Sequence, residues 1–313
     1  MNELKPNSSL SIVIPVYNSE KILAKIVKEI LDICRSRHYN FEVILVDDSS
    51  QDGSWQKAKE LAKCFEEVKA HRLARNYGQS LANLWGFKQS KNDYIITMDD
   101  DGQNPPSEIP KLFEKAEEGH DLVIGKPISK QHGLLRNLGS RLVTNIAKSI
   151  YKTKEPLILS NYRCIHKSVI EKICNERNAN PYLPALILKY STQRTNINVS
   201  HKKRRSGQSN YSLLKLASLV ANLLFGHSVL PLRIAIAVGF TFSLLTALVG
   251  VALVAHYLIN QSNVPGWTSV MVFMAGVCSI VVLILSTIGE YIIRILQEVT
   301  GSRAIYTREE VLK

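Results

Sequence analysis

Cysteine is scarce and scattered in this sequence. Five cysteines, an odd number, occur at positions 34, 64, 164, 174 and 278, and no two of them form a CxxC pair. This pattern argues against a disulfide framework and against a cysteine-based zinc site. We therefore expect the protein to work in a reducing compartment.

Two common nucleotide-binding loops and a secretion signal are also missing. The sequence contains neither GxGxxG nor GxxxxGK[ST], which excludes the usual Rossmann dinucleotide loop and the P-loop. The first residues, MNELKPNSSL, are polar and lack the hydrophobic core of a signal peptide. We therefore expect no cleaved leader and no phosphate site of either type.

Charged residues are missing from one long segment near the C-terminus. No Asp, Glu, Lys or Arg occurs between Arg233 and Glu290, and two apolar runs, about 234–259 and 267–288, fill this gap. Each run exceeds the roughly 20 residues that a helix needs to cross a bilayer. The uncharged connector NQSNVPGW contains proline and glycine, which favour a turn. We predict a transmembrane hairpin over residues 231–294; the alternative is a pair of buried helices in a soluble core.

Basic residues flank the predicted hairpin and are missing from its connector. They occur in HKKRR (201–205) and at Lys215, Arg233, Arg294, Arg303, Arg308 and Lys313. By the positive-inside rule, both termini and the large N-terminal part face the cytosol. Residues 295–313 would form a cytosolic tail. Residues 211–230 would form either an amphipathic helix in the membrane interface or a helix packed on the cytosolic domain.

The whole chain is basic, with 39 Lys and Arg against 27 Asp and Glu and a formal net charge of +12. Such an excess suits an anionic partner, such as nucleic acid, an acidic membrane surface or a phosphorylated ligand. Because HKKRR lies close to the predicted spans, lipid phosphate and the anionic cytosolic leaflet explain the charge better than nucleic acid. An ordinary solvated basic face is the simpler alternative.

The cytosolic domain, residues 1–210, alternates between strand and helix patterns. Apolar strand patterns occupy residues 10–17, 41–48, 69–74, 93–100 and 121–125. Helical spacing of apolar residues occupies 21–36, 54–65, 79–90 and 109–119. This α/β alternation predicts a Rossmann-like, mostly parallel sheet with helices on both faces. In such sheets ligands bind at the carboxyl ends of the strands.

Acidic residues gather at those strand ends, in DDSSQDGS and above all in MDDDGQNPP. Three adjacent carboxylates, Asp99, Asp100 and Asp101, repel one another unless a cation neutralises them. Mg²⁺ or Mn²⁺ suits such oxygen ligands in combination with substrate phosphates. If the strand continues, Asp99 and Asp101 share one side and Asp100 the other. We expect Asp101 to bind the metal, with Asp99 near the ligand and Gln103 adding an amide oxygen; a solvated acidic turn is the alternative.

Several short motifs follow one another along nearly the whole chain. They are IPVYN, VDDSSQDGS, RNYGQ, the DxD of residues 99–101 followed by GQNPP, then GQS, and GEYI after the apolar runs. This order resembles the family-2 glycosyltransferases of GT-A fold, specifically their polyprenyl-phosphate branch. That branch includes dolichol-phosphate mannose synthase and the undecaprenyl-phosphate glucosyl- and aminoarabinose transferases. One departure is GQSNY, in which Asn210 replaces the family's lysine.

For the donor, the resemblance implies that Pro15, Tyr17 and Asn18 line the nucleotide pocket. Asp48 would accept a hydrogen bond from the ring N–H of the base. Asp99 would contact the nucleotide as well as the metal. The full set implied for the diphosphate and the metal is Asp99, Asp101 and Gln103.

For the acceptor, the resemblance implies two basic motifs. Arg136 and Ser140 match an RxxxS stretch that holds the acceptor phosphate. Arg204 and Ser209 match a second motif near the membrane. The catalytic residues implied by the resemblance are Asp99, Asp101, Arg136 and Arg204.

The activity implied is transfer of a sugar from a nucleotide-diphosphate sugar to a polyprenyl (undecaprenyl) phosphate. The resemblance favours uracil as the base, Mg²⁺ or Mn²⁺ as cofactor, inversion at the anomeric carbon, a bacterial inner or plasma membrane location, and a homo-oligomer. One alternative is a processive polysaccharide synthase, but such enzymes typically carry QxxRW, which this sequence lacks. Another is a non-catalytic membrane scaffold that binds nucleotide or lipid.

Overall fold

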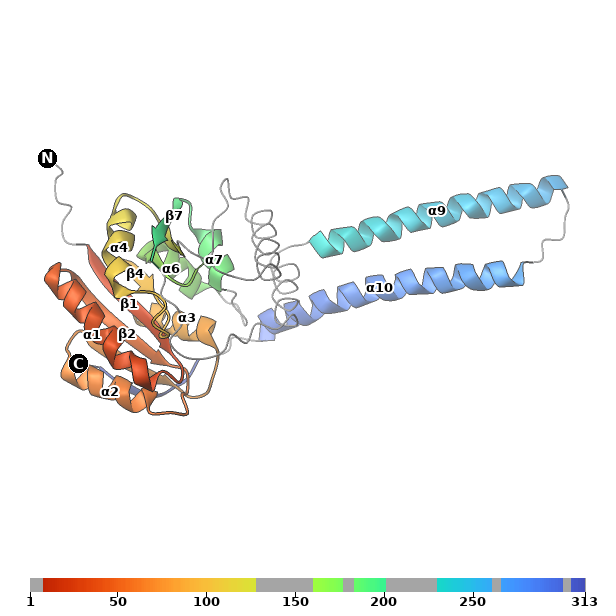
Figure 1. Cartoon of the computed structure of the whole chain (residues 1–313). Coiled ribbons are helices and arrows are strands. Elements are labelled where there is room, and N and C mark those ends of the chain that lie inside the picture. Colours follow the sequence, from red (N-terminus) through yellow and green to blue (C-terminus); the bar gives the residue numbers. More distant parts are fainter. Residues whose placement is uncertain are drawn as a thin grey trace. The chain divides into compact units, whose positions relative to one another are not determined.

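The computed structural model of the protein describes residues 8–127, 160–176, 183–200, 230–260, 266–300 and 305–312. The chain divides into two compact units. The first comprises Met1–Asn210 together with Ser302–Lys313, and the second comprises Tyr211–Gly301. Figure 1 shows that the first unit is an α/β structure and that the second contains two long helices.

An eight-stranded sheet forms the centre of the first unit, in the order β7-β5-β6-β4-β1-β2-β3-β8. Its four parallel central strands are β1 (Ser9–Val16), β2 (Asn40–Asp47), β3 (Val68–Leu73) and β4 (Tyr94–Thr97). β6 (Arg163–His166) runs antiparallel to both of its neighbours, β4 and β5 (Leu122–Pro127), while β7 (Arg194–Val199) is parallel to β5. The sheet is therefore mixed with a parallel centre, as the alternation of strand and helix patterns predicts.

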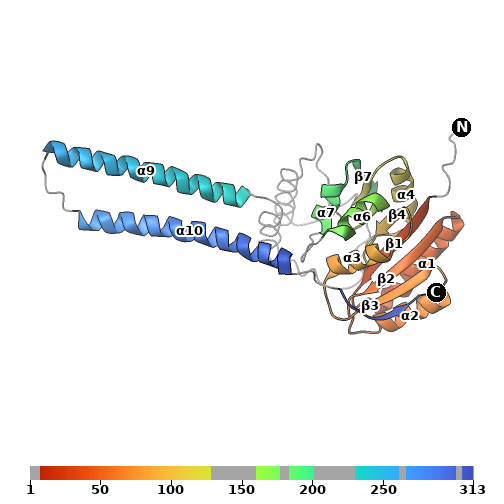
Figure 2. The same ribbon diagram turned by 180° about the vertical axis from the view of Figure 1, so that it is seen from behind.

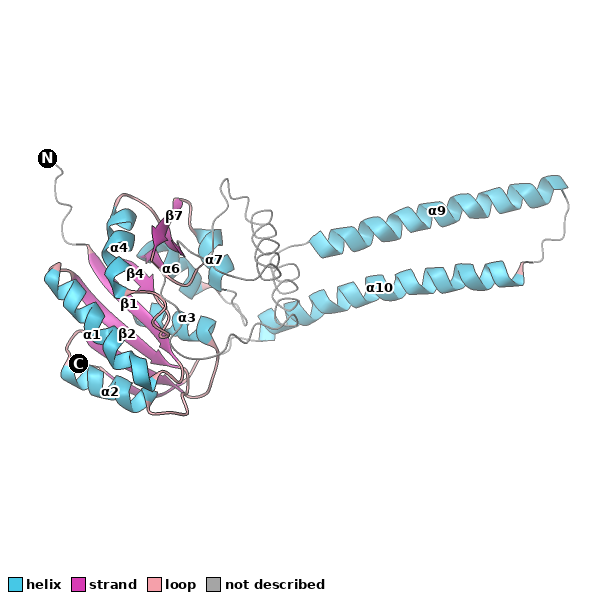
Figure 3. Ribbon diagram, viewed as in Figure 1, coloured by secondary structure: helices cyan, strands magenta, loops and turns pink. Residues whose placement is uncertain are grey.

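Helices cover both faces of this sheet, as the opposite views in Figures 1 and 2 and the colouring in Figure 3 show. Alternate residues of β1 enter different cores: Ile12 and Ile14 pack on one face, and Val13 on the other. The first core includes residues of α1 (Glu20–Ser36), α2 (Ser54–Cys64) and α4 (Ile109–Glu117). The second includes residues of α3 (Gln79–Gln89), α6 (Lys167–Asn175) and α7 (Leu183–Tyr190). A short 3-10 helix, η1 (Pro106–Glu108), precedes α4.

The amphipathic pattern of the sequence explains why these helices pack as they do. In α1, the buried residues recur every three or four positions, which places them on one face: Leu23, Ile26, Val27, Ile30, Leu31 and Cys34. On the opposite face of the sheet, α3 approaches β1 closely at Gly86. A Cβ atom there would lie 2.3 Å from Cγ1 of Val13, so the contact needs glycine.

The C-terminal residues form a strand that sequence analysis did not find. β8 (Thr307–Val311) pairs antiparallel with β3 at the edge of the sheet. Because α10 continues to Thr300, the segment expected as a tail from residue 295 begins as helix and then forms part of the sheet. The five residues TREEV contain two glutamates and only one large apolar residue, so they carry little strand signal of their own.

The second unit contains α9 (Leu230–Asn260) and α10 (Trp267–Thr300). Many of their large apolar side chains are exposed, including Phe240, Val251 and Ile259 of α9 and Val282 and Leu285 of α10. In the described residues, one stretch is long and apolar enough to cross a membrane, Gly276–Ile293 within α10. The two helices occupy the predicted hairpin, and the crossing of the membrane by both remains a prediction. The helix expected at 211–230 lies almost entirely outside the described residues.

Candidate active site

The carboxyl ends of β1, β2 and β4 lie together at one edge of the sheet. The strand register pairs Val16 with Asp47 and Val13 with Thr97, so the loops that follow these strands start close together. These loops contain PVYNS, DDSSQDGS and MDDDGQNPP, the segments that the sequence assigned to the site. The parallel arrangement therefore brings the predicted donor residues to the edge where such sheets bind ligands.

Hydrogen bonds between backbone amides and side-chain oxygens join the loop after β1 to the loop after β2. The amide of Asn18 donates to Oγ of Ser50 at 3.0 Å, and Oδ1 of Asn18 accepts from the amide of Gln51 at 2.9 Å. Asn18 and Ser49 both have positive φ angles, 52° and 59°, which are uncommon for residues other than glycine. Backbone strain of this kind concentrates at functional sites. Tyr17 and Asn18 are exposed on this loop, whereas Pro15 is buried within β1.

Asp48 connects the end of β2 to the RNYGQ loop before α3. Its Oδ1 accepts from the amide of Tyr77 at 2.7 Å and its Oδ2 from the amide of Gly78 at 2.8 Å. Burial raises the pKa of Asp48, and the two amide hydrogen bonds oppose that rise. The family resemblance implies that Asp48 contacts the base of the nucleotide, and this role remains a prediction. In the structure, Asp48 accepts from two backbone amides of the RNYGQ loop and so fixes the position of that loop. The sequence did not reveal these contacts.

The three adjacent aspartates do not continue strand β4. β4 ends at Thr97, and a turn follows, in which Gly102 has a φ of 70° and Oδ1 of Asp101 accepts from the amide of Gln103 at 3.0 Å. The strand predicted to residue 100 is therefore wrong in its last three residues. Acidic and glycine-containing segments favour such turns over strand pairing.

Asp100 faces the loop after β1. Its Oδ2 accepts from the amide of Tyr17 at 2.8 Å and from the hydroxyl of Ser19. Burial raises the pKa of Asp100, and the hydrogen bond from Ser19 opposes the rise. Asp100 thus holds the loop that carries Tyr17.

Asp99 is held by two amide side chains. Nε2 of Gln79 donates to its Oδ1 at 2.5 Å and Nδ2 of Asn161 donates to the same atom at 3.3 Å. Burial, followed by the nearby charge of Asp101, raises the pKa of Asp99 to about 6. Neither amide was assigned to the site from the sequence. Gln79 belongs to the RNYGQ motif, which was the available signal, while no motif marked Asn161.

Residues 11–174 match the sequence model of glycosyl transferase family 2, slightly more than half of the 313 residues. The chain belongs to glycosyl transferase family 2.

Curated relatives of this family 2 glycosyltransferase are similar over nearly its whole length. The undecaprenyl-phosphate 4-deoxy-4-formamido-L-arabinose transferase of Pseudomonas fluorescens (strain SBW25) is 32% identical, covering 98% of this chain and 91% of the relative. The protein of the same name from Yersinia enterocolitica is also 32% identical, with 100% of both chains covered. The protein is thus an enzyme, a glycosyltransferase of the polyprenyl-phosphate sugar transferase type. These comparisons support an enzyme rather than the alternative of a non-catalytic scaffold.

Solved structures match the fold of the first unit. Glucosyl-3-phosphoglycerate synthase from Mycobacterium tuberculosis, in complex with Mn²⁺, UDP and phosphoglyceric acid, superposes with a TM-score of 0.53 at 15% identity, covering 69% of this chain and 76% of that one. A further complex of that synthase, with Mn²⁺, UDP-glucose and phosphoglyceric acid, gives 0.52 at 16% identity over 69% and 79%. At such low identity the likeness shows the fold alone, and it confirms the GT-A-like α/β domain.

The donor set of this family 2 enzyme has the chemistry that a divalent cation needs. In the described residues, no three His, Cys, Asp or Glu side chains gather as a metal-binding group. Mg²⁺ sites, however, commonly use one or two carboxylates together with substrate phosphates. Asp99 and Asp101 supply two carboxylates whose mutual repulsion contributes to the raised pKa of Asp99. The pair therefore fits a cation, and its assignment with Gln103 remains a prediction.

The predicted acceptor residues cannot be placed beside this donor set. Arg136, Ser140, Arg204 and Ser209 all lie outside the described residues. Their assignment to the acceptor phosphate therefore remains a prediction from the family resemblance.

Proposed function

We propose that the protein transfers a sugar from a UDP-sugar to undecaprenyl phosphate at the cytosolic face of a bacterial inner or plasma membrane. The observation that carries this proposal is the hydrogen-bonded assembly of loops at the carboxyl edge of the sheet. Asp48 ties down the RNYGQ loop, Asp100 holds the Tyr17 loop, and Gln79 orients Asp99. These loops combine carboxylates, a side-chain amide and an exposed tyrosine, which are groups expected of a donor site.

Similar proteins suggest the identity of the donor and the acceptor. The glucosyl-3-phosphoglycerate synthase that shares the fold was solved with UDP, which supports uracil as the base. The curated relatives are named for transfer of 4-deoxy-4-formamido-L-arabinose to undecaprenyl phosphate. We therefore place UDP-4-deoxy-4-formamido-L-arabinose first among the candidate donors and undecaprenyl phosphate first among the acceptors.

The proposed reaction needs positioning more than it needs a base. The second pKa of a phosphate monoester is about 6, so the lipid phosphate is largely dianionic near pH 7 and is already a nucleophile. The protein must hold this anion in line with the anomeric carbon, close to the anionic donor, which requires positive charge and fixed geometry. Arg136 and Arg204 are the proposed source of that charge. Direct displacement would invert the anomeric carbon.

On the donor side, Asp99 and Asp101, with Gln103, are the proposed ligands of Mg²⁺ or Mn²⁺. A bound cation would supply charge stabilisation to the departing nucleotide diphosphate. The side-chain amides of Gln79 and Asn161 keep Asp99 in place. The backbone amide of Gln103 keeps Asp101 in place. Tyr17 and Asn18, exposed on the adjacent loop, are proposed to contact the nucleotide.

We further propose that α9 and α10 both span the membrane as a hairpin with both termini in the cytosol. The apolar stretch Gly276–Ile293 and the exposed apolar side chains of both helices support this. The absence of charged residues from position 234 to position 289 supports it as well. The preference for a homo-oligomer rests on the family resemblance.

The test is a glycolipid assay with the purified full-length protein in nanodiscs. The protein is incubated with undecaprenyl phosphate, Mn²⁺ and a panel of UDP- and GDP-sugars, and the lipid products are identified by mass spectrometry. We expect one sugar per lipid, from a UDP donor, with inverted anomeric configuration by NMR. A polymer on the lipid would indicate a processive synthase, and no lipid product from any donor would refute the proposal.

A further inference from the structure

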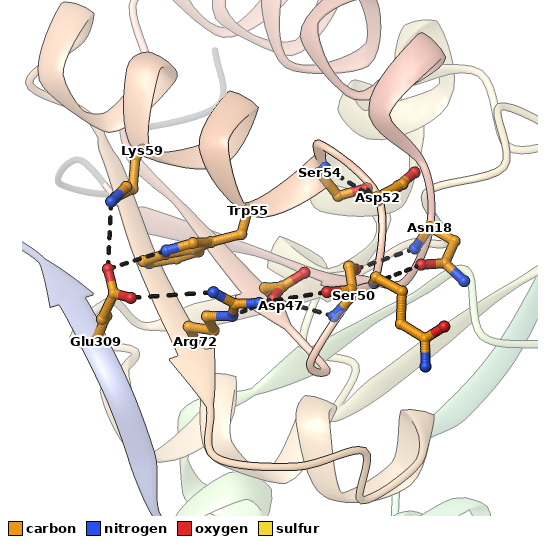
Figure 4. A network of polar contacts seen from close by, with 10 residues as sticks. Asn18, Asp47, Ser50, Asp52, Ser54, Trp55, Lys59, Arg72 and Glu309 are labelled. Carbon is orange, nitrogen blue, oxygen red and sulfur yellow. Dashed lines mark hydrogen bonds and ion pairs between the residues drawn. The ribbon is translucent and has the colours of Figure 1, made fainter.

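Arg72 links the C-terminal strand to the loop that follows β2 (Figure 4). It lies on β3, directly opposite Glu309 of β8 in the strand register. Its Nη2 donates to the carbonyl oxygen of Ser50 at 3.3 Å, and its Nε lies 3.4 Å from Oδ2 of Asp47. One guanidinium therefore contacts the last residue of β2 and the loop that begins there.

Asp47 is the negatively charged partner of Arg72 in this contact. Its side chain is completely buried, and its Oδ1 has no hydrogen-bond partner in the described part of the chain. Its Oδ2 accepts from the amide of Ser50 at 3.3 Å. Burial raises the pKa of Asp47, and the hydrogen bonds from Ser50, followed by the positive charge of Arg72, oppose that rise.

Glu309 and Trp55 lie beside the guanidinium of Arg72. Oε1 of Glu309 lies 3.9 Å from Nη1 of Arg72. Oε2 of Glu309 accepts from Nε1 of Trp55 at 3.1 Å and from Nζ of Lys59 at 3.2 Å. The guanidinium lies 5.9 Å from the centre of the Trp55 ring, within cation–π range. The arginine is thus held from β8 and α2 together.

Beyond Ser50, the connection reaches the proposed donor site. Oγ of Ser50 accepts from the amide of Asn18, and Oδ1 of Asn18 accepts from the amide of Gln51. Tyr17, the exposed aromatic residue proposed to contact the nucleotide, precedes Asn18 directly. Arg72 is therefore connected, through Ser50, to the loops after β1 and β2, which contain residues proposed to contact the nucleotide.

We propose that Arg72, anchored by Glu309, is a positioning residue that sets the loops after β1 and β2 for binding of the donor nucleotide. This inference rests on the proposed function, because it takes these loops as the donor site. It also gives the C-terminal strand a role in donor affinity. No bond is made or broken by Arg72.

The same strand offers a matched control. Lys69 lies near the start of β3, where its Nζ is 2.5 Å from Oε2 of Glu42 on β2. The side chains of Lys69 and Glu42 are only 17% and 9% exposed, so this pair resembles Arg72 and Asp47 in burial. It lies at the amino end of the strands, away from the ligand edge. Lys69→Gln therefore tests the effect of lost stability alone.

The experiment measures UDP affinity, donor KM, kcat and Tm for the full-length protein in nanodiscs with Mn²⁺. Arg72→Gln is expected to raise the Kd for UDP and the donor KM by about tenfold, with kcat within about twofold, as expected when uniform binding is lost. Arg72→Lys should recover part of the affinity, since its ammonium neutralises Asp47 but lacks the planar fork that reaches Ser50 and Glu309. Glu309→Gln should raise Kd by about threefold, and Lys69→Gln should leave it within about twofold while lowering Tm.

The outcomes separate this inference from the proposed function. If the wild-type protein binds no nucleoside diphosphate, the proposed function fails and the positioning role falls with it. If the wild type binds UDP and Arg72→Gln binds it equally well, only the positioning role is refuted. If Lys69→Gln raises the Kd for UDP as much as Arg72→Gln does, the positioning role is also refuted, because the loss of affinity would then come from the loss of stability alone. If Arg72→Gln does not fold, Glu309→Gln decides, since it leaves the pair of Arg72 and Asp47 in place.

Discussion

Replacing Asp48 by asparagine should release the RNYGQ loop, because each carboxylate oxygen accepts a hydrogen bond from a different backbone amide of that loop. Oδ1 binds the amide of Tyr77 at 2.7 Å and Oδ2 binds that of Gly78 at 2.8 Å. An asparagine has one oxygen and can keep only one of these bonds. Its NH₂ group would then face the other backbone N–H, donor against donor.

The size of the effect follows from these contacts. Loss of one hydrogen bond to a charged acceptor costs about 1.5–3 kcal/mol, and the buried N–H left behind adds to the loss. Asparagine is neutral, so the cost of burying the charge of Asp48, which raises its pKa, disappears and offsets part of this loss. We expect a net loss of about 2 kcal/mol in the free energy of unfolding, or about 4–8 °C in Tm for a domain of this size.

Asp121→Asn is the matched control for Asp48→Asn. Asp121 also accepts several hydrogen bonds at a loop, from the amides of Thr192 and Gln193 and the hydroxyl of Thr192, but all of them reach the same atom, Oδ2. An asparagine oxygen can replace that atom and leaves no backbone N–H facing a donor, so we expect a smaller loss than for Asp48→Asn. Asp121 precedes β5, at the end of the sheet away from the site.

The assay combines calorimetric unfolding with donor titration. Because the RNYGQ loop carries Gln79, which binds Asp99, Asp48→Asn should also weaken UDP binding by about tenfold. Asp121→Asn should leave UDP binding unchanged. The reasoning is refuted if both variants lose the same stability, or if Asp48→Asn unfolds earlier while binding UDP as the wild type does.

Three further predictions follow from the site and the core. Asp101→Ala should abolish metal-dependent turnover while the protein stays folded and membrane-bound; wild-type turnover in EDTA would contradict the metal assignment. Arg136→Ala should raise the KM for undecaprenyl phosphate by at least about tenfold and leave UDP affinity within about twofold, whereas equal losses of both would place Arg136 in the donor pocket. Burial alone would raise the pKa of Glu42, but hydrogen bonds from Lys69, Ser11 and a backbone amide outweigh it, so the pKa lies below its usual value of 4.5. Stability from Glu42 is therefore present above about pH 4.5 and is lost as the pH falls through the folded pKa; urea unfolding between pH 3 and pH 7 should show this dependence, and Glu42→Gln should make it shallower.

Much of the first unit could be predicted because its signals are local. β1 and β2 are continuous apolar runs, and α1 has regular helical spacing of its buried residues. The parallel centre of the sheet follows from the alternation of these patterns. Each of these features can be read from a window of about ten to fifteen residues.

The parts that could not be predicted depend on contacts between distant segments. β8 is polar, and it is a strand only because β3 offers an unpaired edge more than two hundred residues earlier in the chain. β6 runs antiparallel between β4 and β5, which its four residues do not reveal.

In the site, too, the local features could be predicted and the contacts between distant segments could not. The sequence placed Asp99 and Asp101 at the donor edge, and it set Asp100 apart by strand alternation. The strand had already ended at Thr97, and what sets Asp100 apart is its contact with the loop of Tyr17 and Ser19. The contacts of Gln79 with Asp99, and of Asp48 with the RNYGQ loop, join segments twenty or more residues apart and had no sequence signal beyond the motifs themselves.

The late position of β8 has a consequence for synthesis of the protein. A ribosome makes β3 early and β8 only after α9 and α10 have been translated, since residues 307–311 follow both helices in the chain. Until then β3 presents an open strand edge, the kind of surface that pairs with other chains and aggregates. The sheet is therefore completed only after the apolar helices have been made. A nascent chain arrested before residue 305 would lack this strand and would leave the edge of β3 unpaired.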